Sequence, residues 1–298
     1  MIFLQAFFFL TLLSALRDIS TKHSLKSIDS DVLAWYTALV ICIITLPLVF
    51  YVWFPSFSWE LFWVSLLTGF LYFSFKYLSF TALSLWDISY ISPLKGLITF
   101  GAIFTEFLVF WILPNTFWFL WIVFLCLGAY FVALKSKKDF PFEPIKRIFT
   151  EKSSQIYLFV ILITSCTVVL DKVWVQLSNP YFWVSLMQFF IFVFSLRSII
   201  KKSWKYFPLI KKSGFSFSLT VFLNSITLLA QMNLLLYLSA SYVSAFKTAS
   251  SIVIVLIWWW VFQERYIKIR FIGSLIMMFW ILLISFSDKI IAFLNSPL

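Results

Sequence analysis

The sequence predicts an all-α membrane protein of ten transmembrane helices, arranged as two inverted five-helix repeats. Its composition is the first observation: 62% of the 298 residues are hydrophobic and 12% are charged, whereas a soluble domain is about half apolar and about a quarter charged. The second is that apolar runs of roughly 20 residues, enough for a helix to cross a hydrocarbon core of about 30 Å, recur along the chain. The third is a stretch that appears twice, as SYISPLK over residues 89–95 and SYVSAFK over 241–247.

The predicted helices are separated mostly by short polar connections. Their apolar runs are continuous, which argues against a transmembrane barrel, because barrel strands alternate over about ten residues. The first run lacks a basic start, since its first charge is Arg17, and no small-residue cleavage site stands out, so a helix is predicted there instead of a signal peptide. The ten helices span residues 2–20, 32–52, 61–80, 87–111, 116–134, 155–173, 181–200, 215–238, 241–263 and 269–287.

Landmark residues recur at nearly constant spacing and divide the chain into two halves. The halves are residues 1–134 and 155–287, joined by a basic cytoplasmic linker over 135–154 and followed by a tail over 288–298. Because five helices is an odd number, the second repeat enters the membrane from the opposite side, as in many transporters with a site near the midplane. The landmark pairs are Lys22 and Lys172, Trp35 and Trp183, and Lys95 and Lys247.

Lysines and arginines gather in the connections on one side of the predicted membrane. The basic segments are mainly 135–152, 197–212 and 265–270, whereas the opposite connections 53–60, 112–115 and 178–180 contain no Lys or Arg. Cytoplasmic loops have this excess of cations, so both termini are predicted to lie outside. These orientation signals explain the net charge of +11, and nucleic acid is not expected as a partner. We expect a multi-pass protein of a bacterial inner (plasma) membrane.

Two lysines lie inside apolar runs, and an intramembrane charge is costly enough to suggest a functional site. Lys95 is expected about 12 Å into the helix that begins at residue 87, and Lys247 about 9 Å into the one that begins at 241. Two structural roles are also open to each lysine: snorkelling to an interface, or an ion pair with Glu106 or Asp171. Helical spacing places Ser92, Thr99, Ala102 and Glu106 on the stripe of Lys95, and Ser244, Ser250 and Ser251 on that of Lys247.

Further polar residues within the predicted helices complete a candidate site. The amides would bind a substrate or join helices, and the tyrosines would stack on a ring. Asp18 and Lys22 are four residues apart and are expected to pair. The candidate substrate-binding residues are Lys95, Lys247, Ser92, Ser244, Tyr90, Tyr242, Gln188, Asn224 and Gln231. The candidate gating or coupling residues are Lys22, Glu106, Asp171 and Lys172.

The residues needed for metal binding or catalysis do not form a pattern. The three cysteines all lie in apolar runs, and the single histidine, His23, has no cluster of partner residues. There is no P-loop pattern for ATP and no nucleophile with a base. No catalytic residue, metal or cofactor is therefore predicted, and the chain is not expected to be an enzyme.

Ten helices in two halves resemble the drug/metabolite transporter superfamily in its EamA-like form. The segment from Tyr237 through Glu264 and Arg265 to Gly273 resembles the family's ninth helix, acidic-basic turn and tenth helix, although Gln263 stands where the family has glycine. The resemblance implies a cavity lined by helices one to four and six to nine, with five and ten at the periphery. It also implies termini in the cytoplasm, opposite to the charge bias.

The resemblance extends to the branch that carries sugar phosphates and nucleotide sugars, which has basic residues on helices four and nine. Lys95 and Lys247 match these positions. The expected function is secondary transport of a small organic anion or zwitterionic metabolite by alternating access, as an exchanger (antiporter). Its partners would be the small-molecule substrate and the lipid bilayer, and a homodimer stays open.

Two alternatives stay open. One is a proton-coupled exporter of amino acids or related metabolites, with Glu106, Asp87 or Asp171 as the proton site. The other, disfavoured by the residue inventory, is a membrane-embedded lipid-modifying enzyme.

Overall fold

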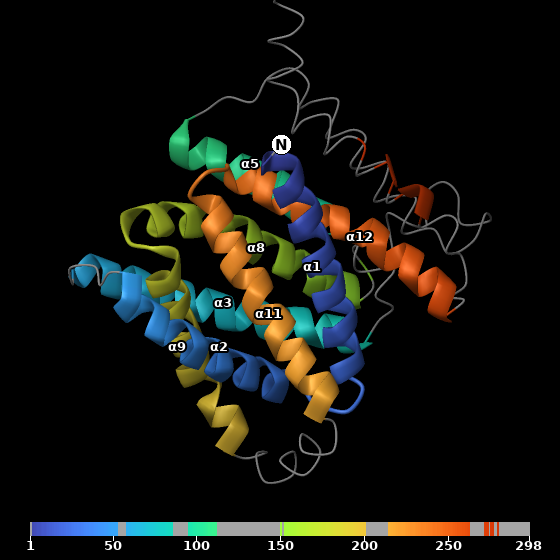
Figure 1. Cartoon of the computed structure of the whole chain (residues 1–298), viewed down its shortest axis with the longest axis horizontal. Coiled ribbons are helices and arrows are strands. Elements are labelled where there is room, and N and C mark those ends of the chain that lie inside the picture. The colour runs from blue at the N-terminus through green and yellow to red at the C-terminus, as the bar shows by residue number, and fades with distance from the viewer. Residues whose placement is uncertain are drawn as a thin grey trace, which may run out of the picture.

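The computed structural model describes residues 2–52, 58–85, 95–111, 150, 152–200, 214–262, 271–273, 275–276 and 279. Within these ranges every secondary-structure element is a helix, as predicted (Figure 1). The elements are α1 (Ile2–Ser24), α2 (Ser30–Val52), α3 (Trp59–Leu85), α5 (Gly96–Phe110), α8 (Lys152–Leu177), α9 (Pro180–Ile200), α11 (Gly214–Leu235) and α12 (Ala240–Phe262). They correspond to the predicted helices one to four and six to nine.

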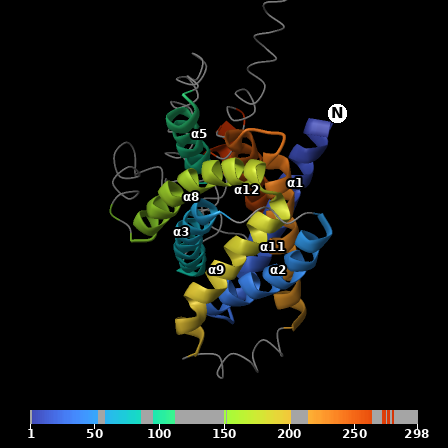
Figure 2. The same ribbon diagram turned by 90° about the vertical axis from the view of Figure 1, so that its left-hand side faces the viewer.

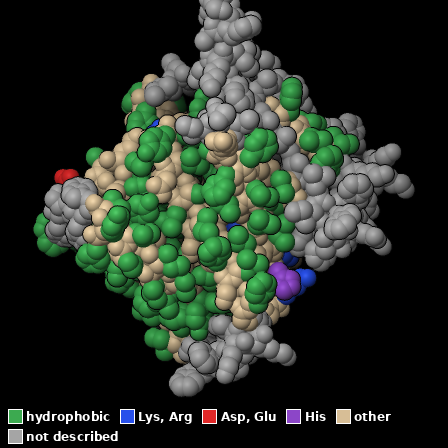
Figure 3. Space-filling view, viewed as in Figure 1, with side chains coloured by type: hydrophobic (Ala, Val, Ile, Leu, Met, Phe, Trp, Pro, Cys, Tyr) green, Lys and Arg blue, Asp and Glu red, His purple; other side chains and the backbone are tan. Residues whose placement is uncertain are grey.

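Four helical segments of the described chain are long and apolar enough to cross a membrane. They are Ser30–Val52, Trp59–Leu85, Ser154–Leu177 and Gly214–Leu235. Large hydrophobic side chains such as Phe50 and Trp63 are exposed, and hydrophobic side chains are spread over the described part of the face shown in Figure 3. Such a surface suits lipid and not water. These findings confirm the prediction of an all-α membrane protein.

Several other predictions lie outside the described residues. These are the fifth helix over 116–134, nearly all of the linker 135–154, the tail 288–298 and most of the tenth helix over 269–287. The basic connections on which the orientation depends lie largely outside as well. The ten-helix count and the orientation therefore stay predictions.

Local sequence explains where the described helices begin and end. α1 runs to Ser24, past the predicted end at residue 20, because Lys22 and His23 in its last turn favour the negative end of the helix dipole. α3 begins after Ser58, whose hydroxyl oxygen accepts a hydrogen bond from the backbone N–H of Leu61 at 3.1 Å. α9 begins with Pro180 after Asn179, a favoured pair of residues for a helix start.

Helices of the first half pack mainly on helices of the second half. α1 contacts α11 and α12, α8 contacts α3 and α5, α2 contacts α9, and α5 contacts α12. Figures 1 and 2 show α2 beside α9 and α1 beside α11 and α12. The first helix of each half thus contacts the third and fourth helices of the other.

Two glycines allow α3 and α5 to approach helices of the second half closely. A Cβ atom added at Gly69 would lie 2.5 Å from Phe190 Cβ, and one at Gly101 would lie 2.6 Å from Ser165 Cβ. Both neighbouring atoms are attached directly to the backbone of another helix, so they cannot rotate away. These crossings tolerate no side chain without a shift of the helices.

Replacing Gly69 with alanine is expected to destabilise the protein by about 1–3 kcal/mol, the usual cost of overpacking a close contact. The clash with Phe190 outweighs the gain in helix propensity of up to about 1 kcal/mol. Gly214→Ala is the matched control, because an added Cβ there meets nothing within 4 Å. Thermal unfolding in detergent measures both variants, and an equal effect of the two would contradict this packing.

Candidate functional site: a cationic cavity between eight helices

A cavity of about 150 Å³ lies at the centre of the bundle, and all eight described helices contribute side chains to its wall. Six of the predicted substrate-binding residues line it: Lys95, Gln188, Asn224, Gln231, Ser244 and Lys247. Tyr90 and Ser92 lie outside the described residues. Tyr242 lies in the first turn of α12 and is not part of the wall.

The charge of the described wall is predominantly positive. Arg17, Lys76, Lys95 and Lys247 line it together with one carboxylate, that of Asp18. Charges in a low-dielectric interior are screened far less than in water. The cavity is therefore suited electrostatically to an anion.

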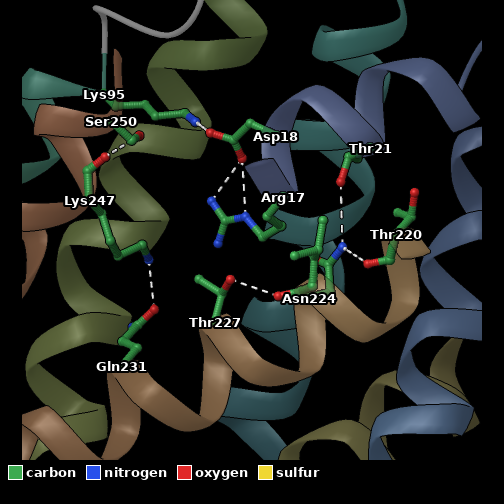
Figure 4. Close-up of polar contacts among 11 residues, drawn as sticks. Arg17, Asp18, Thr21, Lys95, Thr220, Asn224, Thr227, Gln231, Lys247 and Ser250 are labelled. Carbon is green, nitrogen blue, oxygen red and sulfur yellow. Dashed lines mark hydrogen bonds and ion pairs between the residues drawn. The ribbon is translucent and has the colours of Figure 1, made fainter. Parts of the chain in front are cut away.

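Asp18 on α1 binds two of the four cations (Figure 4). Its Oδ1 accepts hydrogen bonds from Arg17 Nη2 at 2.8 Å and from Arg17 Nε at 3.1 Å. Its Oδ2 pairs with Lys95 Nζ. The predicted Asp18–Lys22 pair is wrong, because Lys95 reaches Asp18 from another helix and Lys22 turns toward the end of α3. Lys95 thus forms a structural ion pair, with a partner other than Glu106 or Asp171.

Lys95 also occupies a different place in its helix from the one expected. α5 begins at Gly96, so Lys95 immediately precedes the first turn, while residues 86–94 lie outside the described chain. Its carbonyl oxygen accepts a hydrogen bond from Thr248 Oγ1 at 3.2 Å, and Thr248 Oγ1 lies 3.1 Å from Thr99 Oγ1. Hydroxyl groups therefore join α5 to α12 beside the cavity.

Lys247 on α12 points toward Gln231 on α11 (Figure 4). It lies seven residues after the first residue of α12, about 10 Å along the axis. Its Nζ donates to Gln231 Oε1 on α11 at 2.7 Å. One turn earlier, the Ser244 hydroxyl lines the cavity, is 4% exposed and has no hydrogen-bond partner among the described residues.

Sequence reasoning misses Lys76, a buried cation on α3. Its Nζ donates to Gln188 Oε1 on α9 at 3.4 Å. The predicted third helix ends at residue 80, which places this lysine about one turn from an interface. The helix in fact runs to Leu85, so Lys76 lies deeper. A charge within an apolar run is the signal that could have found it.

Asp171 lies fully buried between three helices. Its two carboxylate oxygens accept hydrogen bonds from Tyr72 Oη on α3 and from Trp183 Nε1 on α9, the latter at 2.9 Å. The Trp183 ring stacks on Trp174, with centroids 5.6 Å apart. Asp171 therefore fixes α8 to α3 and α9, and it is not part of the cavity wall.

The other candidate gating residues also join helices. Lys22 Nζ donates to the carbonyl oxygens of Leu83 and Ser84 in the last turn of α3, where a cation complements the helix dipole. Lys172 Nζ lies 3.8 Å from Glu106 Oε1 and 5.8 Å from the centre of the Phe110 ring. These contacts connect α1 to α3 and α8 to α5.

Glu106 binds the N-terminus of α12 from a neighbouring helix. Its carboxylate accepts hydrogen bonds from the backbone N–H groups of Ala240 at 2.8 Å and of Ser241 at 3.3 Å. The first N–H groups of a helix have no partner within it, and a carboxylate there also complements the helix dipole. Glu106 thus caps α12 in the manner of an N-cap residue.

Glu106→Ala is expected to lower stability by about 0.5–2 kcal/mol, the usual cost of losing a helix cap. Glu106→Gln keeps an acceptor oxygen and is expected to cost less, although it removes the charge. Lys172→Met tests the adjacent ion pair separately. Thermal unfolding of the three variants measures the ranking, and equal effects of alanine and glutamine would contradict the capping role.

Asn224 on α11 bonds within its own helix and also reaches α1. Its Nδ2 donates to the Thr220 carbonyl oxygen at 2.8 Å and to Thr21 Oγ1 at 3.4 Å. Thr220 Oγ1 lies 2.6 Å from Ser20 Oγ and 2.8 Å from Ser24 Oγ. Hydrogen bonds of this kind hold membrane helices together where no hydrophobic driving force acts between them.

No model of a known protein family matches the sequence, and no curated protein matches it either. The resemblance to the drug/metabolite transporter superfamily therefore stays a prediction from the helix pattern and the residue motifs. Among the described residues, no group of three or more His, Cys, Asp or Glu side chains is arranged to hold a metal ion.

Proposed function

We propose that the chain is a secondary transporter that carries a small organic anion by alternating access. The observation that supports this proposal best is the cavity wall, whose described residues include four cations and one carboxylate. Such a site attracts an anion strongly, because the interior screens charge weakly. The residues that we propose to contact the substrate are Lys247, Gln231, Gln188, Asn224 and Ser244. Lys95 and Arg17, which share the Asp18 carboxylate, add to the positive charge of the wall.

The packing of the helices supports an inverted-repeat architecture. α1 contacts the third and fourth helices of the second half, and α8 contacts the corresponding helices of the first. An axis that exchanges the two halves predicts this pattern, and transporters with inverted repeats place their site where the halves meet. The same arrangement is expected from the resemblance to EamA-like transporters.

The contacts of the acidic residues favour an anion carrier over the proton-coupled exporter. Glu106 is engaged in capping α12, and Asp171 accepts hydrogen bonds from two donors. Both carboxylates therefore have structural partners that join or cap helices. A lipid-modifying enzyme has less support still, because the side chain of His23 lies at the surface beside Ser216.

Exchange across a membrane tests the proposal. The purified protein is screened by thermal shift against anionic and zwitterionic metabolites, and the best stabiliser is then used for uptake into proteoliposomes. Uptake is expected to accelerate when the same anion is preloaded, and Lys247→Ala is expected to abolish it. Uptake that ignores preloading would refute exchange, and stabilisation by zwitterions alone would refute the anion site.

A further inference from the structure

Two lysine–glutamine pairs line the cavity on four different helices. Lys76 on α3 donates to Gln188 Oε1 on α9, and Lys247 on α12 donates to Gln231 Oε1 on α11. The side chains of all four residues face the same cavity. Each pair also joins one helix to another without involving a carboxylate.

Each pair has hydrogen-bond donors left over. An ammonium group has three N–H donors, and each lysine donates one of them to its glutamine in the described chain. Because the amide oxygen of each glutamine faces its lysine, the amide Nε2 group is left as a donor. No described residue accepts a hydrogen bond from Nε2 of Gln188 or of Gln231. An ammonium beside an amide N–H is a donor set suited to a carboxylate.

The other two cations of the wall are already occupied. Arg17 and Lys95 share the carboxylate of Asp18, so a ligand would have to compete with an ion pair within the protein. Lys76 and Lys247 have only a neutral amide oxygen as partner in the described chain. The positive charge available to a ligand is therefore concentrated at the two lysine–glutamine pairs.

The two pairs reach the cavity from different helices. Lys76 on α3 donates to Gln188 on α9, and Lys247 on α12 donates to Gln231 on α11. Helix α3 packs mainly on α8 and α9, whereas α12 packs mainly on α1 and α5. The two ammonium groups therefore face the cavity from helices that are not main packing partners of each other.

We propose that the transported anion is a small aliphatic dicarboxylate, with one carboxylate bound at Lys76–Gln188 and the other at Lys247–Gln231. This rests on the proposed carrier function and specifies its substrate class. The cavity of about 150 Å³ is smaller than the roughly 300–1,000 Å³ of pockets for drug-sized ligands, which favours a short carbon chain. The unpartnered Ser244 hydroxyl beside Lys247 supplies one more hydrogen bond to the second carboxylate.

A chain-length series tests this assignment on the purified full-length protein. Malonate, succinate, glutarate and adipate are compared with butyrate and inorganic phosphate by thermal shift and by isothermal titration. One dicarboxylate is expected to bind at least tenfold more tightly than butyrate or phosphate. The optimum chain length reports the distance between the two pairs.

Variants of each pair separate ligand binding from folding. Lys76→Met or Lys247→Met is expected to weaken the best dicarboxylate about ten- to one-hundredfold, the usual value of a hydrogen bond to a charged group. Each is also expected to remove the preference over butyrate, because one carboxylate site remains. Lys26→Met, an exposed lysine outside the cavity wall, is the control.

Gln188→Glu covers the case in which the methionine variants fail to fold. It is nearly isosteric and gives Lys76 a carboxylate partner, as Asp18 does for Lys95. The variant is expected to stay folded and to lose the preference for the dicarboxylate. A preference that survives Gln188→Glu or Lys76→Met overturns the assignment, as does equal binding of butyrate or phosphate by the unmodified protein.

The binding and exchange experiments distinguish a wrong dicarboxylate assignment from a wrong carrier function. Binding and exchange of some other anion would leave the carrier function standing and remove only the dicarboxylate assignment. If neither the dicarboxylates nor any other anion binds, both proposals fall.

Discussion

Asp18→Ala is expected to destabilise the protein by about 3–5 kcal/mol, because removing one partner of a buried ion pair leaves an uncompensated charge in the interior. Here the loss is shared by two cations, since Arg17 and Lys95 both pair with this carboxylate. Thermal unfolding in detergent, followed by the loss of monodisperse protein on heating, measures the effect.

A double variant identifies the cause of this loss. Lys95→Met in the Asp18→Ala background removes one of the two unpaired cations and is expected to restore part of the stability. The two changes should therefore be strongly non-additive, as expected for residues in direct contact. Glu60→Gln, an exposed carboxylate in the first turn of α3, is the control. If Asp18→Ala behaved like this control, the ion pair would have no structural role.

Asp171→Ala is expected to cost about 2–5 kcal/mol, because it leaves two buried donors, Tyr72 Oη and Trp183 Nε1, without their acceptor. Asp171→Asn keeps one acceptor oxygen and should cost less. The same thermal assay measures both variants. Near-ultraviolet circular dichroism is expected to change as well, since Trp183 stacks on Trp174.

A different outcome would assign Asp171 another role. If Asp171→Asn unfolded like the unmodified protein but lost transport driven by a pH gradient, the residue would be a proton site, as in the exporter alternative. The structural role predicts the reverse, with stability reduced and no dependence on a pH gradient.

Much of the fold is predictable because apolar runs of membrane length leave few alternatives. α2 ends at Val52, the predicted end, and α9 begins within one residue of the predicted start. The ends of α1 and α3 are less predictable: α1 continues into the polar residues 21–24, and α3 continues through residues 81–85, where two hydroxyl residues interrupt the apolar run. Lys22 of α1 donates to carbonyl oxygens of the last turn of α3, a contact between helices that no local pattern contains.

The candidate site is predictable in its members but not in its pairings. Lys247, Gln188 and Gln231 stand out because polar groups are rare in such runs, and all three line the cavity. The ion pair of Lys95 depends on which helix lies beside α5. Sequence spacing gives neighbours only within one helix, so it pairs Asp18 with Lys22 and cannot find Lys95.

The interleaved packing has a consequence for biosynthesis. α1 has its main partners in α11 and α12, which begin at residues 214 and 240. At about 5–20 residues per second, the ribosome needs roughly 10–40 s to make the intervening chain. During that time α1 is without α11 and α12, and until residue 188 is made Lys76 is without Gln188. The nascent first half must therefore be held by lipid, by the insertion machinery or by its own Asp18–Lys95 pair until the second half arrives.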